Sequence, residues 1–292
     1  MIDSKEISVV IQGPVHGTEH DPPDMQWTKL AADSIRHHLP KAEIILSTWQ
    51  EVDSKFITYD KLIVNTEPPP IKNLPSDVNP NLNRLICTTA NGIKASTREY
   101  VLKIRSDMSL AGTSFLSFFR KYQKYDERYK LLGERIIIPN ILANAKTCLV
   151  SDWTSFGLRS DMILYWDIPY TEERPYLSNQ YLCNEQYIST HLFAKSPYFS
   201  FSDTVSCEKF FVNNFLVVDT KHFSFKKHKV YPYGFAQLMR WTNHYEWLYL
   251  YKIHCLKQPA INLRSWVRPV VTSLGDLKSA IYMRLRKLQK NM

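Results

Sequence analysis

Four short stretches of this sequence combine charged side chains with strong secondary-structure signals. The first is residues 100–109, in which an apolar run with strand character ends in Arg105, Ser106 and Asp107. Ligands of open α/β sheets bind at the carboxyl ends of strands. At such a strand end, Arg105 would offer a cation to a phosphate, and Asp107 a carboxylate to a metal ion or a ribose hydroxyl. The same residues also fit a salt-bridged turn between a strand and a helix.

The second stretch, residues 81–93, has the spacing of a helix that Asn81 caps. Asn83 and Arg84 would then lie in its first turn. The N-terminus of a helix is an anion site, and an arginine there reinforces a contact with a diphosphate. A capping asparagine and a solvated arginine are the plainer interpretation of the same pattern.

The other two stretches contribute carboxylates. Residues 147–157 place Asp152 among aromatic residues and a glycine. This combination suits stacking on a sugar and hydrogen bonding to its hydroxyls, although aromatic residues also fill cores. Residues 181–193 indicate a helix with Glu185 near its start, where the helix dipole stabilises an anion. Glu185 would serve either as a helix cap or as a general base that activates a hydroxyl.

An α/β sheet is expected to position these residues, because strand candidates alternate with helix candidates. The first strand ends in Gly13 and Pro14, and the second ends in Thr48 and Trp49. A glycine there lets backbone amides approach a phosphate, but residues 13–17 match neither the dinucleotide fingerprint nor a Walker loop. We expect strands at 6–12, 42–49, 61–65, 100–109 and 135–139, a strand pair at 209–218, and helices at 26–39, 81–93, 113–125, 181–193 and 235–256.

Composition limits the class of protein. The chain has 292 residues, of which 44% are hydrophobic, so it forms one large globular domain or two closely packed ones. The sequence lacks an apolar run long enough to cross a bilayer and a signal-peptide layout, so we expect a cytoplasmic protein. The cysteines lack zinc-ligand spacing, and we expect them reduced and mostly in the core, with neither disulfides nor structural zinc. They are Cys87, Cys148, Cys183, Cys207 and Cys255.

The net charge of +9 is unevenly distributed. Between residues 263 and 292, seven basic residues stand against one acidic residue. Residues 274–292 have apolar residues at the spacing of an amphipathic helix, which predicts contact with an anionic membrane surface. A helix packed on the domain has the same pattern. Recognised nucleic-acid motifs are absent from the sequence, so we expect no nucleic-acid partner.

Several motifs together resemble the WavE-type lipopolysaccharide synthesis family, which consists of bacterial proteins regarded as glycosyltransferases. The resemblance extends from about residue 6 to about residue 240, and the basic C-terminus lies outside it. Its motifs are 9–14 (VVIQGP), 46–49 (LSTW), Asn83-Arg84 with Thr88-Thr89, 103–107 (KIRSD), 151–153 (SDW) with Phe156-Gly157, and 184–187 (NEQY).

The resemblance implies a GT-A-like, Rossmann-type α/β sheet with helices on both faces and a helical, aromatic-rich C-terminal region. Residues 1–145 would bind a nucleotide sugar, residues 146–260 would form the acceptor side of the same domain, and residues 261–292 would be a basic amphipathic segment. The implied activity is transfer of a sugar to a hydroxyl of a glycan or glycolipid acceptor, in lipopolysaccharide core, O-antigen or capsule. The enzyme would act at the inner membrane as a peripheral protein, and a non-catalytic scaffold of polysaccharide assembly is the alternative.

The resemblance also implies roles for individual residues. Glu185 is the first candidate for the catalytic base, and Asp152 is the second. In GT-A enzymes an Asp-x-Asp motif at a strand end commonly holds a divalent metal, and Arg105-Ser106-Asp107 would be its equivalent here, with a cation in place of one carboxylate and Asp107 as the remaining ligand for Mn²⁺ or Mg²⁺. The residues expected on the nucleotide-sugar side are Gln12, Gly13, Pro14, Thr48, Trp49, Asn83, Arg84, Arg105 and Asp107.

Overall fold

A computed structural model describes most of the chain, namely residues 2–49, 54–72, 81–173, 175–177, 180–223, 225–228 and 240–261. The amphipathic helix predicted at 274–292 lies outside the described residues, and so does the rest of the basic segment after Ile261. Helices long and apolar enough to span a membrane are absent from the described part.

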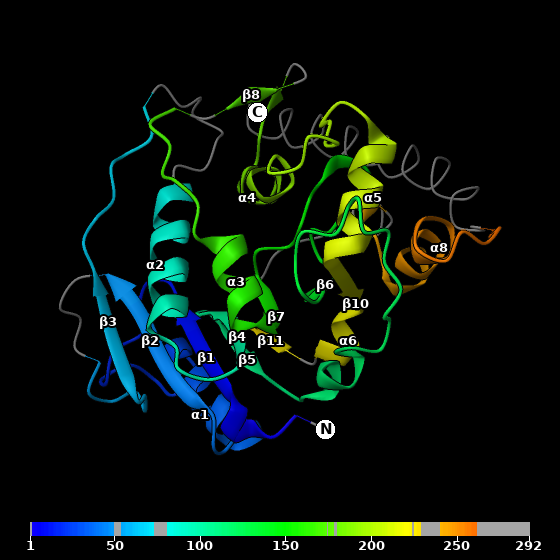
Figure 1. Cartoon of the computed structure of the whole chain (residues 1–292). Coiled ribbons are helices and arrows are strands. Elements are labelled where there is room, and N and C mark those ends of the chain that lie inside the picture. The colour runs from blue at the N-terminus through cyan, green and yellow to red at the C-terminus, as the bar shows by residue number, and fades with distance from the viewer. Residues whose placement is uncertain are drawn as a thin grey trace, which may run out of the picture.

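The described residues form a seven-stranded sheet with the strand order β10-β6-β7-β4-β1-β2-β3 (Figure 1). Within this sheet β7 alone runs antiparallel to its neighbours, and the other strands share one direction. The predicted Rossmann-type α/β sheet is thereby confirmed. The strands are β1 (Ile7–Gln12), β2 (Glu43–Trp49), β3 (Lys61–Asn65), β4 (Tyr100–Arg105), β6 (Ile136–Pro139), β7 (Thr154–Leu158) and β10 (Phe215–Val218).

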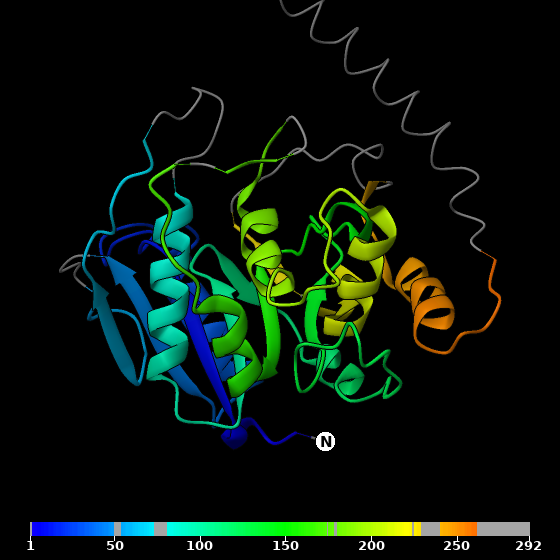
Figure 2. The same ribbon diagram turned by 45° about the horizontal axis from the view of Figure 1, so that its top comes forward.

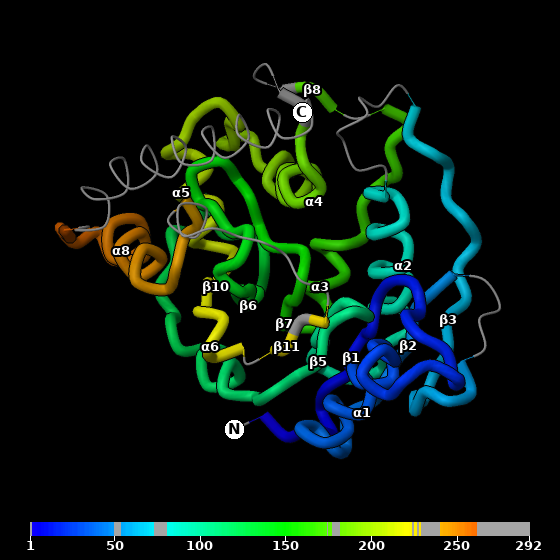
Figure 3. Tube along the Cα trace, turned by 180° about the vertical axis from the view of Figure 1, so that it is seen from behind, coloured from blue at the N-terminus to red at the C-terminus, as the bar shows by residue number. Residues whose placement is uncertain are grey.

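Helices cover both faces of the sheet, which explains why the central strands are nearly continuous runs of apolar residues. On the face toward the viewer in Figure 1, α2 packs on β1, β2 and β3, and α3 packs on β4 and β7. Figure 3 shows α1 on the opposite face. These helices are α1 (Trp27–His38), α2 (Leu82–Ala95) and α3 (Arg159–Trp166).

At the β10 end of the sheet, α5 and α8 pack on each other and on β10 (Figure 2). They carry buried aromatic residues, among them Phe210 and Trp247, as predicted for a helical, aromatic-rich C-terminal region. The other α-helices of the described residues are α4 (Asn184–Phe193), α5 (Thr204–Asn214), α6 (Thr220–Phe223) and α8 (His244–His254). The 3₁₀ helices are η1 (Ser4–Glu6), η2 (Ser114–Phe118) and η3 (Ala145–Thr147). Two small two-stranded sheets pair β5 (Met108–Leu110) with β11 (Phe225–Lys227), and β8 (Tyr176–Leu177) with β9 (Gln180–Tyr181).

Two predicted elements are wrong. The helix predicted at 113–125 is only the short 3₁₀ helix η2, after which Arg120 adopts a left-handed backbone conformation with φ of 57° that a helix does not continue through. The strand pair predicted at 209–218 is the end of α5 followed by β10. The apolar run at 210–212 belongs to a buried helix, and periodicity alone does not separate a short buried helix segment from a strand.

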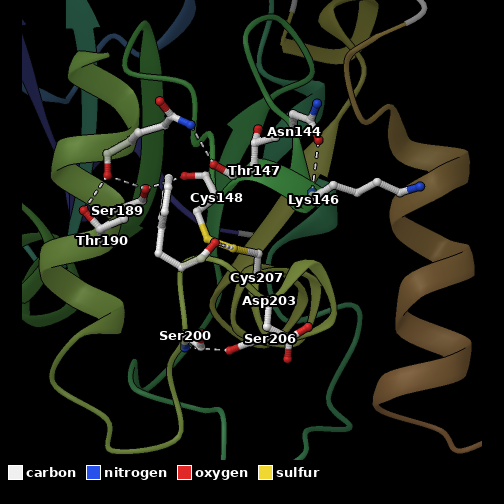
Figure 4. The surroundings of a disulfide bond; sticks show 12 residues. Asn144, Lys146, Thr147, Cys148, Ser189, Thr190, Ser200, Asp203, Ser206 and Cys207 are labelled. Atoms are coloured by element: carbon white, nitrogen blue, oxygen red, sulfur yellow. Dashed lines mark hydrogen bonds between the residues drawn. A yellow bond between two sulfur atoms is a disulfide. The ribbon is translucent and has the colours of Figure 1, made fainter. Parts of the chain in front are cut away.

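The expectation that all cysteines are reduced is also wrong, because Cys148 and Cys207 form a disulfide (Figure 4). Their Cα atoms lie 5.2 Å apart, although 59 residues separate them in the sequence. The bond joins the residue after η3 to the first turns of α5, and both cysteines are fully buried. The other three cysteines are free thiols.

Candidate functional site

A cavity of about 460 Å³ lies at the edge of the sheet where β1, β2 and β4 end. Because β7 runs antiparallel to β4, the turn that precedes β7 reaches the same edge. The N-termini of α2 and α4 complete the walls. Nine of the eleven predicted site residues line this cavity, namely Gln12, Gly13, Pro14, Trp49, Arg84, Arg105, Asp107, Asp152 and Glu185.

At the end of β1, the backbone of Gly13 passes very close to β4. Gly13 has a φ of 123°, and a Cβ atom there would lie 2.8 Å from Oγ of Ser106. The Ser106 amide donates to the carbonyl of Gln12 at 2.9 Å, which fixes the two strand ends against each other. Only glycine fits this position, which explains the residue type found there. The buried Oε1 of Gln12 has no hydrogen-bond partner within the described residues, so it is available to a ligand.

Arg105 and Asp107 form a close ion pair in the cavity wall. Nη2 of Arg105 lies 2.8 Å from Oδ2 of Asp107, and the Asp107 side chain is only 4% exposed. Burial alone would raise the pKa of Asp107, but the hydrogen bonds and charge of Arg105 outweigh it and hold that pKa below its usual value. The Arg105 guanidinium also lies 5.7 Å from the ring centroid of Trp153. Arg105 is therefore held between a carboxylate and an aromatic ring.

The Asp107 carboxylate, the predicted metal ligand, is already engaged by Arg105. Both carboxylate oxygens accept hydrogen bonds from Arg105, at 2.9 and 2.8 Å. A cation bound by Asp107 would have to displace the guanidinium or lie beside it. Groups of three or more metal-ligating His, Cys, Asp or Glu side chains are also absent from the described part of the chain.

The start of α2 contributes Arg84 but not Asn83. Arg84 forms an ion pair with Glu67 at 2.5 Å, and its side chain is 57% exposed. The side-chain amide of Asn83 instead donates to the carbonyls of Pro69 and Thr171, at 2.7 and 2.8 Å. Asn83 therefore connects two loops outside the cavity.

Two further sequence predictions at this edge differ in detail from the structure. Asn81 occupies the N-cap position, but its side chain makes no capping hydrogen bond and accepts one from Asn184 at 3.4 Å. This contact joins the starts of α2 and α4. Thr48 is buried and does not line the cavity, whereas its neighbour Trp49 does.

Asp152 and Glu185 lie in the part of the cavity wall built from the second half of the chain. Oδ1 of Asp152 is buried and has no hydrogen-bond partner within the described residues. Glu185 is in the first turn of α4, as predicted. Burial raises the pKa of Tyr165 well above its usual value, and the charges of Asp152 and Glu185 raise it further. Asp152 and Glu185 line the same cavity.

The start of α4 is held by the loop that carries the disulfide. The side-chain amide of Gln186 donates to the carbonyl of Thr147 at 3.0 Å. The hydroxyl of Ser189 donates to the carbonyl of Cys148, as Figure 4 shows. Because Cys148 is bonded to α5, the position of Glu185 depends on a loop that a covalent bond fixes.

Sequence reasoning missed part of the lining. Ser106 and Trp153 are direct neighbours of predicted site residues, so their chain position was a usable signal. Leu142 had no such signal, because it is not a neighbour of any predicted site residue in the sequence and lies beside them only in the folded protein. The additional lining residues are His16, Asn81, Leu85, Ser106, Leu142, Trp153 and Asn184.

Comparison with known proteins identifies the family. The family model described as WavE lipopolysaccharide synthesis matches residues 7–197, about two thirds of the chain. The chain belongs to this family. Membership in the WavE family associates the protein with lipopolysaccharide synthesis. The matched region includes every predicted site residue.

Similar solved structures include 4-diphosphocytidyl-2C-methyl-D-erythritol synthase from Anaerococcus prevotii DSM 20548. It is 12% identical with a TM-score of 0.40, and the match covers 85% of this chain and 99% of that chain. HddC from Yersinia pseudotuberculosis is 10% identical with a TM-score of 0.32, covering 57% and 81%. Its complex with GMP-PN is 10% identical with a TM-score of 0.31, covering 57% and 80%. Similarity at these identities and TM-scores does not indicate a function for this chain. No curated protein sequence matches the chain.

Proposed function

We propose that this WavE-family protein is a glycosyltransferase that moves a sugar from a nucleotide-sugar donor to a hydroxyl of a bacterial surface glycan. The sheet would serve as a GT-A-like donor-binding unit, and the acceptor would be lipopolysaccharide or a related glycolipid. The observation that carries the proposal is one cavity that combines two arginines, Arg84 and Arg105, with the carboxylates of Asp152 and Glu185, besides the Asp107 carboxylate that pairs with Arg105. Membership in a lipopolysaccharide synthesis family supports the choice of acceptor.

The arginines suit the departing diphosphate. Arg84 lies at the start of α2, where the helix dipole also favours an anion, and Arg105 lies at the end of β4. Cations near the bond that breaks stabilise negative charge as it develops on the leaving phosphate oxygen. Gln12 would add an uncharged hydrogen-bonding group beside them.

The carboxylates suit the acceptor. In a single displacement, Glu185 takes the proton of the acceptor hydroxyl while that oxygen bonds to the anomeric carbon of the donor sugar. The bond from the anomeric carbon to the phosphate oxygen breaks, and the nucleoside diphosphate leaves with the bonding electrons. Asp152 is the second candidate for the base, because its buried Oδ1 lacks a hydrogen-bond partner among the described residues.

Arg105 would neutralise the diphosphate of the donor, which is the role that a divalent metal would otherwise have. It already pairs with the carboxylate of the Arg105-Ser106-Asp107 motif, and it retains 29% exposure of its side chain. Neutralisation of the diphosphate is therefore assigned to Arg84 and Arg105. Attachment to an anionic membrane through the basic segment 261–292 remains part of the proposal, and this segment after Ile261 lies outside the described residues.

The deciding experiment measures donor binding and turnover separately. Purified protein is screened by thermal shift against nucleotides and nucleotide sugars, because a ligand of the folded state raises the apparent melting temperature. Each donor that binds is then tested for hydrolysis and for transfer to lipopolysaccharide fragments. Glu185→Gln is expected to abolish transfer while nucleotide binding survives.

Glu127→Gln is a matched control, because Glu127 is exposed and outside the cavity. This variant is expected to behave as the wild type does. An active Glu185→Gln enzyme would move the role of base to Asp152. A protein that binds donors but never turns them over, with every acceptor tried, would favour the scaffold of polysaccharide assembly.

A further inference from the structure

Lys103 is a lysine in the middle of the sheet. It lies in β4, which pairs with β1 on one side and with β7 on the other, and its side chain has no exposed surface. Burying an ammonium group costs free energy, and an apolar side chain of similar size would stabilise the sheet better. The need for a stable core therefore does not explain a lysine at this position.

The contacts of the Lys103 ammonium connect it to the wall of the cavity. The group donates a hydrogen bond to the backbone carbonyl of Asp152, in the turn that precedes β7. It also lies 5.1 Å from the ring centroid of Trp166, which belongs to α3. Lys103 thus joins β4, the Asp152 turn and α3 from below the cavity, while the Asp152 carboxylate stands in the cavity wall.

Polar atoms without partners surround this contact. Ser155 is directly opposite Lys103 in the antiparallel pairing of β4 with β7. The hydroxyls of Ser155 and Tyr165 and the indole nitrogen of Trp166 are buried and have no hydrogen-bond partner within the described residues. A purely structural layer between a sheet and a helix is normally apolar or fully paired. This layer is neither.

Charged groups face the Lys103 ammonium from several elements packed around it. Burial lowers the pKa of Lys103 to about 7, against the attraction of Asp152. The charge of Arg105 in the same strand also lowers this pKa, whereas Asp107 and Glu185 raise it. From α3, Tyr165 is the titratable neighbour of Trp166. The electrostatic state of Lys103 is therefore coupled to the cavity carboxylates of Asp107, Asp152 and Glu185.

We propose that Lys103 is a positioning residue, which fixes the Asp152 turn from beneath and places its charge under the Asp152 and Glu185 carboxylates. The effect of Lys103 on catalysis rests on the proposed function. The electrostatic coupling of Lys103 to Asp152 and Glu185 does not, because it can be measured without any enzyme activity. Lys103 does not line the cavity, so it acts on a ligand only through the residues above it.

The first test follows the titration of Lys103 in protein labelled with ¹³C and ¹⁵N at lysine. One lysine side chain is expected to titrate near pH 7, and this signal should be missing in Lys103→Met. Asp152→Asn should move the midpoint to lower pH, because it removes the charge that favours the ammonium form. Glu127→Gln should leave it in place. A Lys103 signal that Asp152→Asn does not move would overturn the proposal.

The second test uses whichever donor the wild-type protein hydrolyses. Lys103→Met is expected to lower kcat by about 100-fold, the scale of a small misplacement of catalytic groups, with little change in KM. Lys103→Arg, which keeps the charge, should recover part of kcat. Lys195→Met, at an exposed lysine outside the cavity, is the control. Wild-type kcat in a folded Lys103→Met enzyme would refute the positioning role.

The two tests separate the two proposals. If no donor is turned over, the proposed function fails, and the titration still decides whether Lys103 and the carboxylates are coupled. If Lys103→Met does not fold, Lys103→Arg, which also lacks the lysine signal, assigns it, and the titration of the wild-type protein and of Asp152→Asn remains decisive. If turnover is found and Lys103→Met matches the wild type, the positioning role alone is refuted.

Discussion

The guanidinium of Arg105 donates to both carboxylate oxygens of Asp107, from Nε at 2.9 Å and from Nη2 at 2.8 Å. Bidentate pairs of this kind are stronger than single hydrogen bonds and fix the orientation of the arginine. Asp107 is almost completely buried, whereas Arg105 keeps part of its surface at the cavity. The Asp107 carboxylate therefore fixes the orientation of Arg105, and the Arg105 guanidinium is the group of the pair that would contact a ligand in the cavity.

Removal of divalent metal is expected to leave nucleotide binding unchanged, since Arg105 occupies the oxygens that a metal would use. The dissociation constants of uridine, guanosine and cytidine diphosphates can be measured by calorimetry with EDTA and with Mn²⁺. The two series should agree within about 2-fold for any nucleotide that binds. A loss of affinity of about tenfold in EDTA that Mn²⁺ restores would contradict this prediction.

Loss of the Cys148–Cys207 bond is expected to destabilise the protein strongly. Closing a loop of 59 residues restricts the unfolded chain and is worth about 4 kcal/mol in the chain-entropy account. Urea unfolding of the wild type and of the double variant Cys148→Ser/Cys207→Ser measures the difference. A phosphine reductant should lower the stability of the wild type and have no effect on the double variant. Equal stability of the two proteins would count against the prediction.

Acid is expected to weaken the fold through Glu43. Burial opposes ionisation of this side chain, but hydrogen bonds from Lys61, Ser8 and Thr97 prevail and lower its pKa to about 2. Since the folded state has the lower pKa, the stabilisation is fully present above the usual value of 4.5 and is lost as the pH falls toward 2. The loss amounts to about 3 kcal/mol.

Urea unfolding at pH 6 and at pH 3 tests this prediction. The difference between the two pH values should shrink in Glu43→Gln, which has no proton to gain at this site. The same difference in the wild type and in the variant would assign the acid sensitivity to other carboxylates.

Gly92→Ala is expected to destabilise the protein, although alanine is the better helix former. A Cβ atom at Gly92 would lie 2.4 Å from Cγ1 of Val10 and 3.0 Å from Cβ of Ser47, in the two strands beneath α2. Overpacking a tight core costs about 1–3 kcal/mol, which exceeds the gain in helix propensity of about 1 kcal/mol. Gly133→Ala is the control, because its new Cβ would meet nothing closer than 3.4 Å. Thermal unfolding that ranks Gly92→Ala above the wild type would refute this account.

Elements with a strong local signal could be predicted from the sequence. β1, β2 and β4 are apolar runs that give way to glycine, to an aromatic residue and to charged residues respectively, and each strand ends at the cavity edge. Asp152 could be placed in the site because it is the carboxylate of a short aromatic segment, and Glu185 because it begins a helix. The carboxyl edge of the sheet then brought these residues together.

Features that depend on contacts between distant segments could not be predicted. Cys148 and Cys207 show no spacing pattern, because only the packing of η3 against α5 makes them neighbours. Asn83 looked like an anion ligand from its place in α2, yet its partners are two loops, one of them 88 residues away. Lys103 looked like an ordinary residue of an apolar strand, because its role depends on a turn 49 residues later.

Trp49 and Trp153 both line the cavity. Indole emission responds to the polarity of its surroundings and to nearby quenching groups, so occupancy of the cavity should alter the intrinsic fluorescence of the unmodified protein. The two indoles would therefore report binding of a ligand in this cavity, including the proposed donor. Donors can be ranked by titration before any acceptor is known, and the Trp49→Phe and Trp153→Phe variants would reveal which indole senses each part of the ligand.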